Sequence, residues 1–216
     1  MTGIWPQLYM NMEKVYPFGC ELKAITSAAV LACDGLDGVV DGLISNPDAC
    51  LASFDPFQLI GTTISNCSQT GSEVQISEGA AKLANATWHG ARSSDGHQLW
   101  YGLNVGSTFD VIAGTNCTGG VCVADPGRYG WDLFKWFVAK DPDFDPSTVT
   151  HEIYDAMGHS AFQQYQSAMD FDDPDLTEFR KAGGKLLTYH GLVSALIPQG
   201  FCQWQWLCAR TNEFAL

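Results

Sequence analysis

The chain has 216 residues, 24 of them acidic and 11 basic, which gives a formal net charge of −13 at neutral pH. Only 16% of the residues are charged and 12% are aromatic, a composition that excludes a disordered chain or a coiled coil. A surface this negative repels phosphate groups, so we expect neither nucleic acid nor an anionic membrane as a partner.

The first half of the chain predicts two helices around a glycine-rich loop. Apart from Lys23, residues 23–32 are small or apolar, which favours a short, mostly buried helix that runs into Cys33. Residues 72–88 predict a second helix, because four residues fall on one helical face: Ile76, Ala80, Leu83 and Thr87. The next stretch, residues 89–126, is rich in glycine, serine and turn pairs, so we expect irregular structure or short strands there.

The second half predicts three more helices. Helical spacing returns over residues 127–140 with apolar groups on more than one face, so this helix should be covered on several sides. A further helix is expected at about residues 150–167. The third begins with Asp173 as its N-cap and Pro174 at its first position, and it ends at the glycine pair 183–184.

A short apolar strand is predicted at residues 185–190, and Gly191 turns the chain after it. A helix, a glycine pair and a strand in this order are typical of the last part of an α/β sheet. One convincing strand is too few for an α/β core. The sequence therefore predicts an inserted domain joined to a fragment of its host domain.

Residues 33–50 contain the most informative pattern in the chain. Asp34, Asp37 and Asp41 are each followed by a glycine, and no lysine or arginine lies nearby. Crowding three carboxylates is unfavourable unless a cation joins them. Ca²⁺ suits such a loop, because it accepts about six to eight oxygen ligands at flexible angles. The glycines would let the carbonyl groups of Val39 and Leu43 turn inward as further ligands.

Other cations fit this loop less well. Mg²⁺ prefers water ligands and a stricter octahedron, and Zn²⁺ prefers nitrogen or sulfur ligands. The spacing of the aspartates also differs from that of an EF-hand. The remaining alternative is a solvated acidic turn that holds no metal.

Several segments also carry a family resemblance. Cys-Glu-Leu at 20–22 and CDGLDGVVDGLISNPDAC at 33–50 resemble the fungal tannase and feruloyl esterase family of secreted serine esterases. Further segments are similar to the same family in the same order, at residues 76–104, 140–145, 163–192 and 196–198. The resemblance therefore extends over about residues 20–198.

The resemblance implies a carboxylic ester hydrolase that acts on small aromatic esters or on esters of plant polymers. In this family an α/β-hydrolase core carries a Ser-Asp-His triad, and a large inserted lid domain holds one structural Ca²⁺. The family's calcium motif would place side-chain ligands at Asp34, Asp37 and Asp41, and backbone carbonyl ligands at Val39 and Leu43.

The same resemblance suggests how the chain is divided. Residues 1–180 would form the lid-like insert, residues 181–198 a fragment of the α/β-hydrolase core, and residues 199–216 an atypical tail. A disulfide between Cys33 and Cys50 would enclose the calcium loop.

Eight cysteines and three Asn-X-Ser/Thr sequons, at Asn66, Asn85 and Asn116, favour an oxidising, secretory compartment. No two cysteines have CxxC spacing, which argues against a zinc ribbon. Cys117 and Cys122 are close enough to close a small loop together, whereas the pairing of the others stays open: Cys20, Cys67, Cys202 and Cys208. The first residues do not resemble a signal peptide, so we expect the natural front end to be missing.

The predicted catalytic residues lie outside the chain. In the family the nucleophile precedes the Cys-Glu-Leu segment and the histidine base follows the HG-x-x-D-x-L-I-P motif. In residues 190–198 Ser194 occupies the position of the catalytic aspartate, and a serine brings no charge to stabilise an imidazolium. His190 precedes the acid position, so we expect it to be structural.

Three functional hypotheses follow. The first is a partial tannase or feruloyl esterase that lacks its nucleophile and base. The second is a catalytically inactive calcium-binding lid module, or a fragment produced by a gene model. The third and weakest is a different hydrolase that uses Ser160 or Ser68, since neither serine lies in a complete nucleophile elbow.

Overall fold

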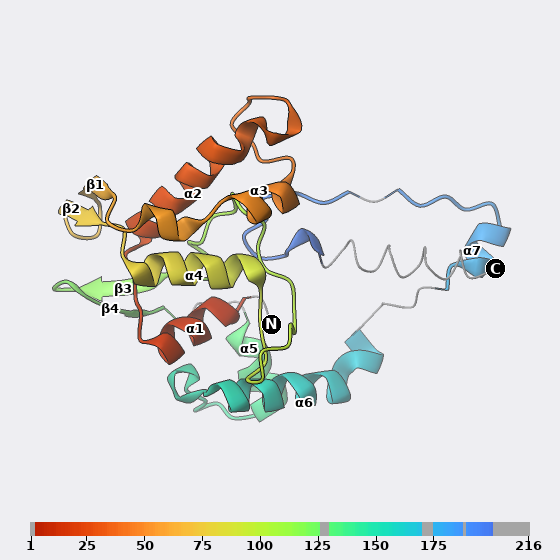
Figure 1. Cartoon of the computed structure of the whole chain (residues 1–216). Coiled ribbons are helices and arrows are strands. Elements are labelled where there is room, and N and C mark those ends of the chain that lie inside the picture. Colours follow the sequence, from red (N-terminus) through yellow and green to blue (C-terminus); the bar gives the residue numbers. More distant parts are fainter. Residues whose placement is uncertain (1–2, 126–129, 170–174, 188, 201–216) are drawn as a thin grey trace.

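The computed structural model describes residues 3–125, 130–169, 175–187 and 189–200. Within these ranges the fold is mostly helical with two small antiparallel hairpins (Figure 1). The α-helices are α1 (Trp5–Glu13), α2 (Gly19–Cys33), α3 (Pro47–Ser53), α4 (Glu78–His89), α5 (Trp131–Leu133), α6 (His151–Met169) and α7 (Thr177–Lys181). The strands are β1 (Thr63–Cys67), β2 (Ser72–Gln75), β3 (Thr115–Thr118) and β4 (Val121–Ala124). Short helical turns are η1 (Asp34–Asp37), η2 (Pro56–Leu59) and η4 (Pro146–Thr148), and η3 (Phe134–Ala139) is π-helical.

Helix α4 lies at the centre of the fold, between α2 and α3 on one side and α1 on the other (Figure 1). It begins at Ser77, whose hydroxyl accepts the N–H of Ala80 as a side-chain cap. Half of its buried residues are alanines, and these small side chains let the neighbouring helices approach closely. Leu83 and Trp88 fill the remaining space in the main core.

A second core lies between α1 and the segment from α5 to α6. Trp131, Phe134 and Tyr154 are buried there against Trp5 and Leu8 of α1. The indole N–H of Trp5 donates to the carbonyl oxygen of Ala86 in α4, 3.0 Å away. Helix α1 therefore connects the two cores.

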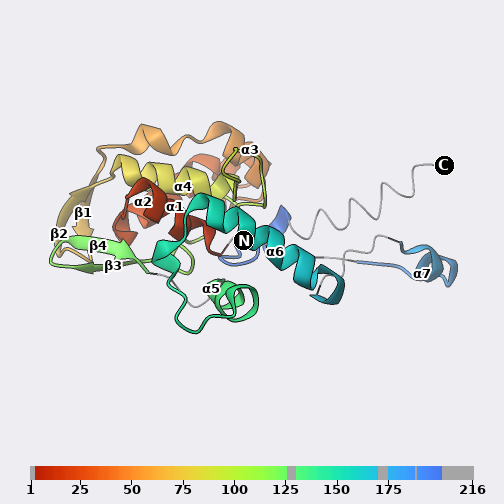
Figure 2. The same cartoon turned by 90° about the horizontal axis from the view of Figure 1, so that it is seen from below.

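The two hairpins lie at one end of the molecule and α7 lies at the opposite end (Figures 1 and 2). Near the hairpins, the disulfide Cys20–Cys67 joins the start of α2 to the end of β1. Two further disulfides are Cys33–Cys50 and Cys117–Cys122. The predicted pairings are thus both confirmed.

Two of the predicted helices are confirmed in type and place. Residues 23–32 belong to α2, which starts earlier, at Gly19, and ends at Cys33. The expectation that they are mostly buried is wrong, because only Ile25 and Ala29 are buried and Leu31 is 84% exposed. Residues 150–167 correspond to α6. The expectation of irregular structure or short strands over residues 89–126 is also confirmed, because the described part of this stretch contains loops and the hairpin of β3 and β4.

The predicted helix over residues 72–88 is wrong at its start. Residues 72–75 form β2, which pairs antiparallel with β1, and the helix begins only at Glu78. Hydrogen bonds from another strand thus override the local helical spacing, and the N-cap at Ser77 separates the two elements.

The helix predicted over residues 127–140 is observed as α5 and η3, which together cover residues 131–139. It is not covered on several sides as expected. Trp131 and Phe134 are buried, whereas Trp136 and Phe137 are half exposed on the other face. The N-cap predicted at Asp173, the helical start at Pro174 and the cysteines at 202 and 208 lie outside the described residues.

The strand predicted at residues 185–190 is wrong for the residues described there. No strand forms at 185–187 or 189–190, and Leu187 and Tyr189 are 91% and 98% exposed. A strand needs a neighbour to accept its hydrogen bonds, and this segment has none within the described part of the chain. It leads back from α7 towards the main body (Figure 1).

Candidate functional site

The acidic loop starts where α2 ends and folds back on itself. Oδ1 of Asp34 accepts the backbone N–H groups of both Asp41 and Gly42, each at 2.9 Å. These two hydrogen bonds hold the backbone of the third aspartate of the motif beside the side chain of the first. Gly42 has φ 82°, a left-handed conformation that permits this turn without strain.

The other two aspartates close smaller turns inside the loop. Oδ1 of Asp37 accepts the N–H of Val39 at 2.9 Å, and Oδ1 of Asp41 accepts the N–H of Leu43 at 3.1 Å. The N–H of Val39, followed by the Ser45 hydroxyl, lowers the pKa of Asp37 below its ordinary value. The carboxylate of Asp37 is therefore held near the backbone of the loop in its charged form.

The donor chemistry of this loop suits a hard cation, but its carboxylates do not converge on a single point. Across the described ranges, no three His, Cys, Asp or Glu side chains form a group that could hold a metal ion. Asp37 and Asp41 are exposed, and Asp34 is half-buried. An ion would thus have to draw the carboxylates together from the positions described here.

The disulfide Cys33–Cys50 closes the acidic loop at its base. Both cysteines are buried in the main core, at the end of α2 and within α3. Asn46 caps α3 by accepting the N–H of Ala49 at 3.2 Å. The position of the loop is therefore set at both ends by buried structure, although its middle lies in solvent.

A cavity of about 220 Å³ lies beside α3, the helix that follows the acidic loop in the chain. Residues of α3 form part of its wall. Its apolar wall includes Leu51 of α3, Trp88 at the end of α4, and Tyr101. Asn104 and Gln199 are among its polar lining residues. An aromatic wall with a few amide groups suits a small, flat ligand that carries polar substituents.

Two glycines allow the chain to form this cavity. A Cβ on Gly90 would lie 2.5 Å from the backbone nitrogen of Gly102, and a Cβ on Gly102 would lie 2.0 Å from the carbonyl oxygen of Trp88. The N–H of Leu103 donates to the carbonyl oxygen of Thr87 at 3.1 Å. The loop after α4 is therefore held against the C-terminal end of that helix.

Asn104 connects the cavity to the segment near residue 200. Its amide nitrogen donates to the carbonyl oxygen of Leu192 and to the side-chain oxygen of Gln199, each at 2.9 Å. The sequence motif that contains Ser194 is thereby attached beside the cavity.

Ser194 has a local structural contact. Its hydroxyl accepts the N–H of Ile197 at 3.2 Å, which caps the turn that follows. The ring of His190 hydrogen-bonds through Nδ1 to the carbonyl oxygen of Gly191 at 2.7 Å.

Neither of the other two candidate serines is activated. The hydroxyl of Ser160, on α6, accepts a hydrogen bond from Gln164, and Ser68 is exposed just after β1. Among the residues the structure describes, no hydrogen bond joins a serine hydroxyl to a histidine ring.

A Ser-Asp-His group does occur in the turn at residues 93–97, but its order is not that of a catalytic triad. The hydroxyl of Ser93 donates to Asp95, and the ring of His97 lies 3.5 Å from the other oxygen of the same carboxylate. In acyl transfer the imidazole must lie between the serine and the acid. Here the carboxylate lies between them, so this group shapes a turn.

A second cavity, of about 360 Å³, lies between this turn and α6. Asp155 lines it and accepts two hydrogen bonds from Ser94, from the backbone N–H at 2.8 Å and from the hydroxyl at 2.6 Å. Sequence reasoning missed both residues. The contact spans 61 positions, so no local pattern could have indicated it.

The comparisons with known proteins agree with one another. A family model described as "Tannase and feruloyl esterase" matches residues 3–199. The chain is 35% identical over 197 residues to a probable feruloyl esterase of Arthroderma benhamiae, covering 91% of this chain and 36% of that protein. It is 25% identical over 232 residues to a tannase of Aspergillus oryzae, covering 91% and 39%.

Two solved structures have the same fold. A tannin acyl hydrolase from Aspergillus niger matches with a TM-score of 0.90 at 25% identity, covering 99% of this chain and 40% of that one. Feruloyl esterase B from Aspergillus oryzae matches with a TM-score of 0.73 at 20% identity, covering 98% and 40%. This chain thus spans 36% and 39% of the lengths of the two curated relatives named above.

Proposed function

This chain belongs to the tannase and feruloyl esterase family of carboxylic ester hydrolases, and we propose that it serves the hydrolysis of esters of aromatic acids. The observation that carries the proposal is the fold match to a tannin acyl hydrolase over 99% of the chain. The names of the relatives, feruloyl esterase and tannase, support aromatic acyl groups as the substrate class.

We assign the chain the role of a lid-like domain that contributes to the binding of the aromatic acyl group. The cavity beside α3 supports this role, since a volume of about 220 Å³ suits a single substituted ring. Trp88 and Tyr101 offer aromatic contacts, and the side-chain oxygen of Asn104, a lining residue, would accept hydrogen bonds from ring hydroxyl groups.

The chemical step needs a serine nucleophile, a histidine base and a carboxylate that orients the base. We infer that the described side chains do not supply this set, because none of their hydrogen bonds pairs a serine hydroxyl with a histidine ring. This observation favours a second candidate function, a calcium-binding lid module that holds aromatic ligands without cleaving their esters.

One experiment separates these two functions. Purified full chain is titrated with ferulic and gallic acids while Trp fluorescence is recorded, and is then incubated with methyl ferulate and methyl gallate. Binding without hydrolysis above the buffer rate is expected for the lid role. Hydrolysis above the buffer rate would show that the chain has its own catalytic set, and its loss in a Ser160→Ala, Ser68→Ala variant would assign that set to one of these serines. Absence of binding would remove the proposed pocket.

We further propose that the acidic loop binds one structural Ca²⁺. Asp34, Asp37 and Asp41 would supply carboxylate oxygens, and Val39 and Leu43 backbone carbonyl oxygens. The support is the oxygen-only donor set and the closure of the loop by Asp34. When bound, the ion would neutralise the loop and fix its conformation.

Calorimetry on chelator-treated protein tests the calcium proposal. We expect one binding event, its loss in Asp37→Asn and Asp41→Asn, and its retention in Asp110→Asn, which changes an exposed aspartate outside the loop. At a Ca²⁺ concentration of ~100 times Kd, binding should stabilise the fold by about 2.7 kcal/mol. Heat of binding that is unchanged in both loop variants would contradict the assignment.

We also propose that the protein is secreted. Three disulfides link the described residues, and such bonds persist mainly in oxidising compartments. No described helix has the length and apolar character needed to cross a membrane.

A further inference from the structure

The three sequons have very different surroundings in the folded chain. Asn66 is exposed on β1 and Asn116 is exposed on β3, whereas Asn85 is half-buried within α4. Modification of an asparagine by an oligosaccharide needs room for a bulky, hydrated group at that position. The two exposed sequons lie on the hairpins at the same end of the molecule, opposite α7 (Figures 1 and 2).

The hairpin of β3 and β4 exposes apolar side chains next to one of these asparagines. In the register of the two strands Asn116 faces Val123, and Thr118 faces Val121. Directly opposed residues share one face of a hairpin, so all four side chains lie on the same face. Val121 is 70% exposed and Val123 is 56% exposed.

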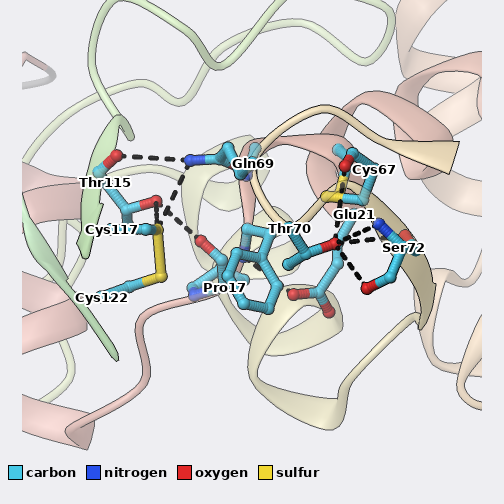
Figure 3. Close-up of a disulfide and its surroundings, with 12 residues drawn as sticks. Pro17, Glu21, Cys67, Gln69, Thr70, Ser72, Thr115, Cys117 and Cys122 are labelled. Carbon is cyan, nitrogen blue, oxygen red and sulfur yellow. Dashed lines mark hydrogen bonds between the residues drawn. A yellow bond between two sulfur atoms is a disulfide. The ribbon is translucent and has the colours of Figure 1, made fainter. Parts of the chain in front are cut away.

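The opposite face of this hairpin is already occupied. The Cys117–Cys122 disulfide lies on it, and the Gln69 side chain donates to Sγ of Cys117 and to the carbonyl oxygen of Thr115 (Figure 3). Gln69 also accepts the N–H of Gly19 at the start of α2. One face is thus attached to the body of the protein, and the face with the two valines is open.

We propose that Asn116 carries an N-linked oligosaccharide whose first sugar covers Val121 and Val123, that Asn66 is a second acceptor, and that Asn85 stays unmodified. An N-acetylglucosamine attached to Asn116 starts beside Val123, and its apolar ring face can pack on the valines. The glycan would also cover a strand pair whose edges invite pairing with other chains. This inference rests on the secretory route proposed above.

The reaction requires a lipid-linked diphosphate oligosaccharide as co-substrate. The side-chain nitrogen of Asn116 attacks C1 of the first N-acetylglucosamine and forms a C1–N bond. The bond between C1 and the diphosphate oxygen breaks, the lipid diphosphate leaves, and the amide nitrogen loses one proton. Thr118, the third residue of the sequon, is exposed.

The environment of Asn85 opposes the same reaction product. The hydroxyl of Thr87, the third residue of that sequon, is buried and donates to the carbonyl oxygen of Leu83 at 2.7 Å. Ala84 and Thr87 on either side of Asn85 are buried against neighbouring elements. A chain with a glycan at Asn85 could not bury α4 as described, so the folded, secreted population should lack it.

The test imposes the secretory route, so it does not depend on the natural one or on any esterase activity. The full chain is secreted from yeast behind an added signal sequence. Glycosidase treatment in heavy-oxygen water then converts each glycosylated asparagine to a labelled aspartate for peptide mass spectrometry. Label at Asn66 and Asn116 but not at Asn85 is expected. Secreted protein unlabelled at Asn116 or at Asn66, or labelled at Asn85, overturns the assignment.

A matched pair of variants tests what the glycan covers. Thr118→Ala should lose one glycan and self-associate in light scattering, whereas Thr118→Ser keeps the sequon and should stay monomeric. Adding Val121→Thr and Val123→Thr to Thr118→Ala should restore the monomer. If Thr118→Ala is not secreted, the glycans are removed enzymatically from folded protein instead. Protein that stays monomeric after loss of the glycan contradicts the covering role.

Discussion

The carboxylate of Glu21 joins the first turn of α2 to the N-cap of α4 by accepting the backbone N–H of Ser77 at 2.7 Å. Its other oxygen accepts the N–H of Phe18 at 2.8 Å. Glu21 is only 3% exposed, so both oxygens are removed from water and satisfied by backbone donors. A single buried charge thus holds two helix starts that are 56 positions apart.

Glu21→Ala should lower the free energy of unfolding by about 3 kcal/mol. The substitution leaves two backbone N–H groups without their acceptors, and hydrogen bonds to charged groups contribute about 1.5–3 kcal/mol each. Urea unfolding of the oxidised protein, followed by far-UV circular dichroism, measures the change. Glu73→Ala, at an exposed position of β2, is the control. Equal urea midpoints for the two variants would show that the hydrogen bonds of Glu21 do not stabilise the fold.

The disulfides should differ in how much they stabilise the fold. Cys20–Cys67 spans 47 positions and Cys117–Cys122 spans five. Restriction of the unfolded chain predicts losses of about 4 kcal/mol and about 2 kcal/mol when the two bridges are removed separately. Paired Cys→Ser variants compared by urea unfolding provide the test. A larger loss for the hairpin bridge would reverse this order and contradict the chain-entropy explanation.

Local patterns were sufficient for the elements whose stability is mostly local. The helix before Cys33 follows from its run of small and apolar residues, and a helix lies at α6, where one was expected. The acidic loop could be located from its aspartates and glycines, and its closing disulfide followed from the family resemblance. The strand at 185–190 failed because the apolar character of Leu187 and Tyr189 does not reveal whether a neighbouring strand exists.

The cavity beside α3 could not be predicted from the sequence. Its wall combines residues between Pro47 and Gly200, and what brings them together is the close approach of residues 90 and 102. Such contacts depend on backbone geometry, which has no signature in apolar periodicity. The two hydrogen bonds of Asn104 to the segment near residue 200 are equally non-local.

Gly102→Ala should therefore destabilise the protein and disrupt the cavity. A Cβ at this position would lie 2.0 Å from the carbonyl oxygen of Trp88, so the backbone must shift, which costs about 3 kcal/mol by analogy with overpacked cores. Thermal unfolding and fluorescence titration with ferulic acid report on stability and binding. Gly191→Ala is the control, since a Cβ there meets no atom within 4 Å. Identical behaviour of the two variants would exclude this steric explanation.

The acidic loop should lose its internal structure in acid. The N–H of Val39, and then the Ser45 hydroxyl, lower the pKa of Asp37 from its ordinary value of 3.8. The contribution of the ionised carboxylate is thus fully present above pH 3.8 and is lost as the pH falls through the lower pKa of the folded state. An NMR titration of the Val39 amide in calcium-free buffer should show a midpoint below 3.8. Asp37→Asn should abolish this transition and Asp110→Asn should leave it unchanged, whereas a midpoint above 3.8 would show that the hydrogen bond from Val39 does not favour the charged carboxylate.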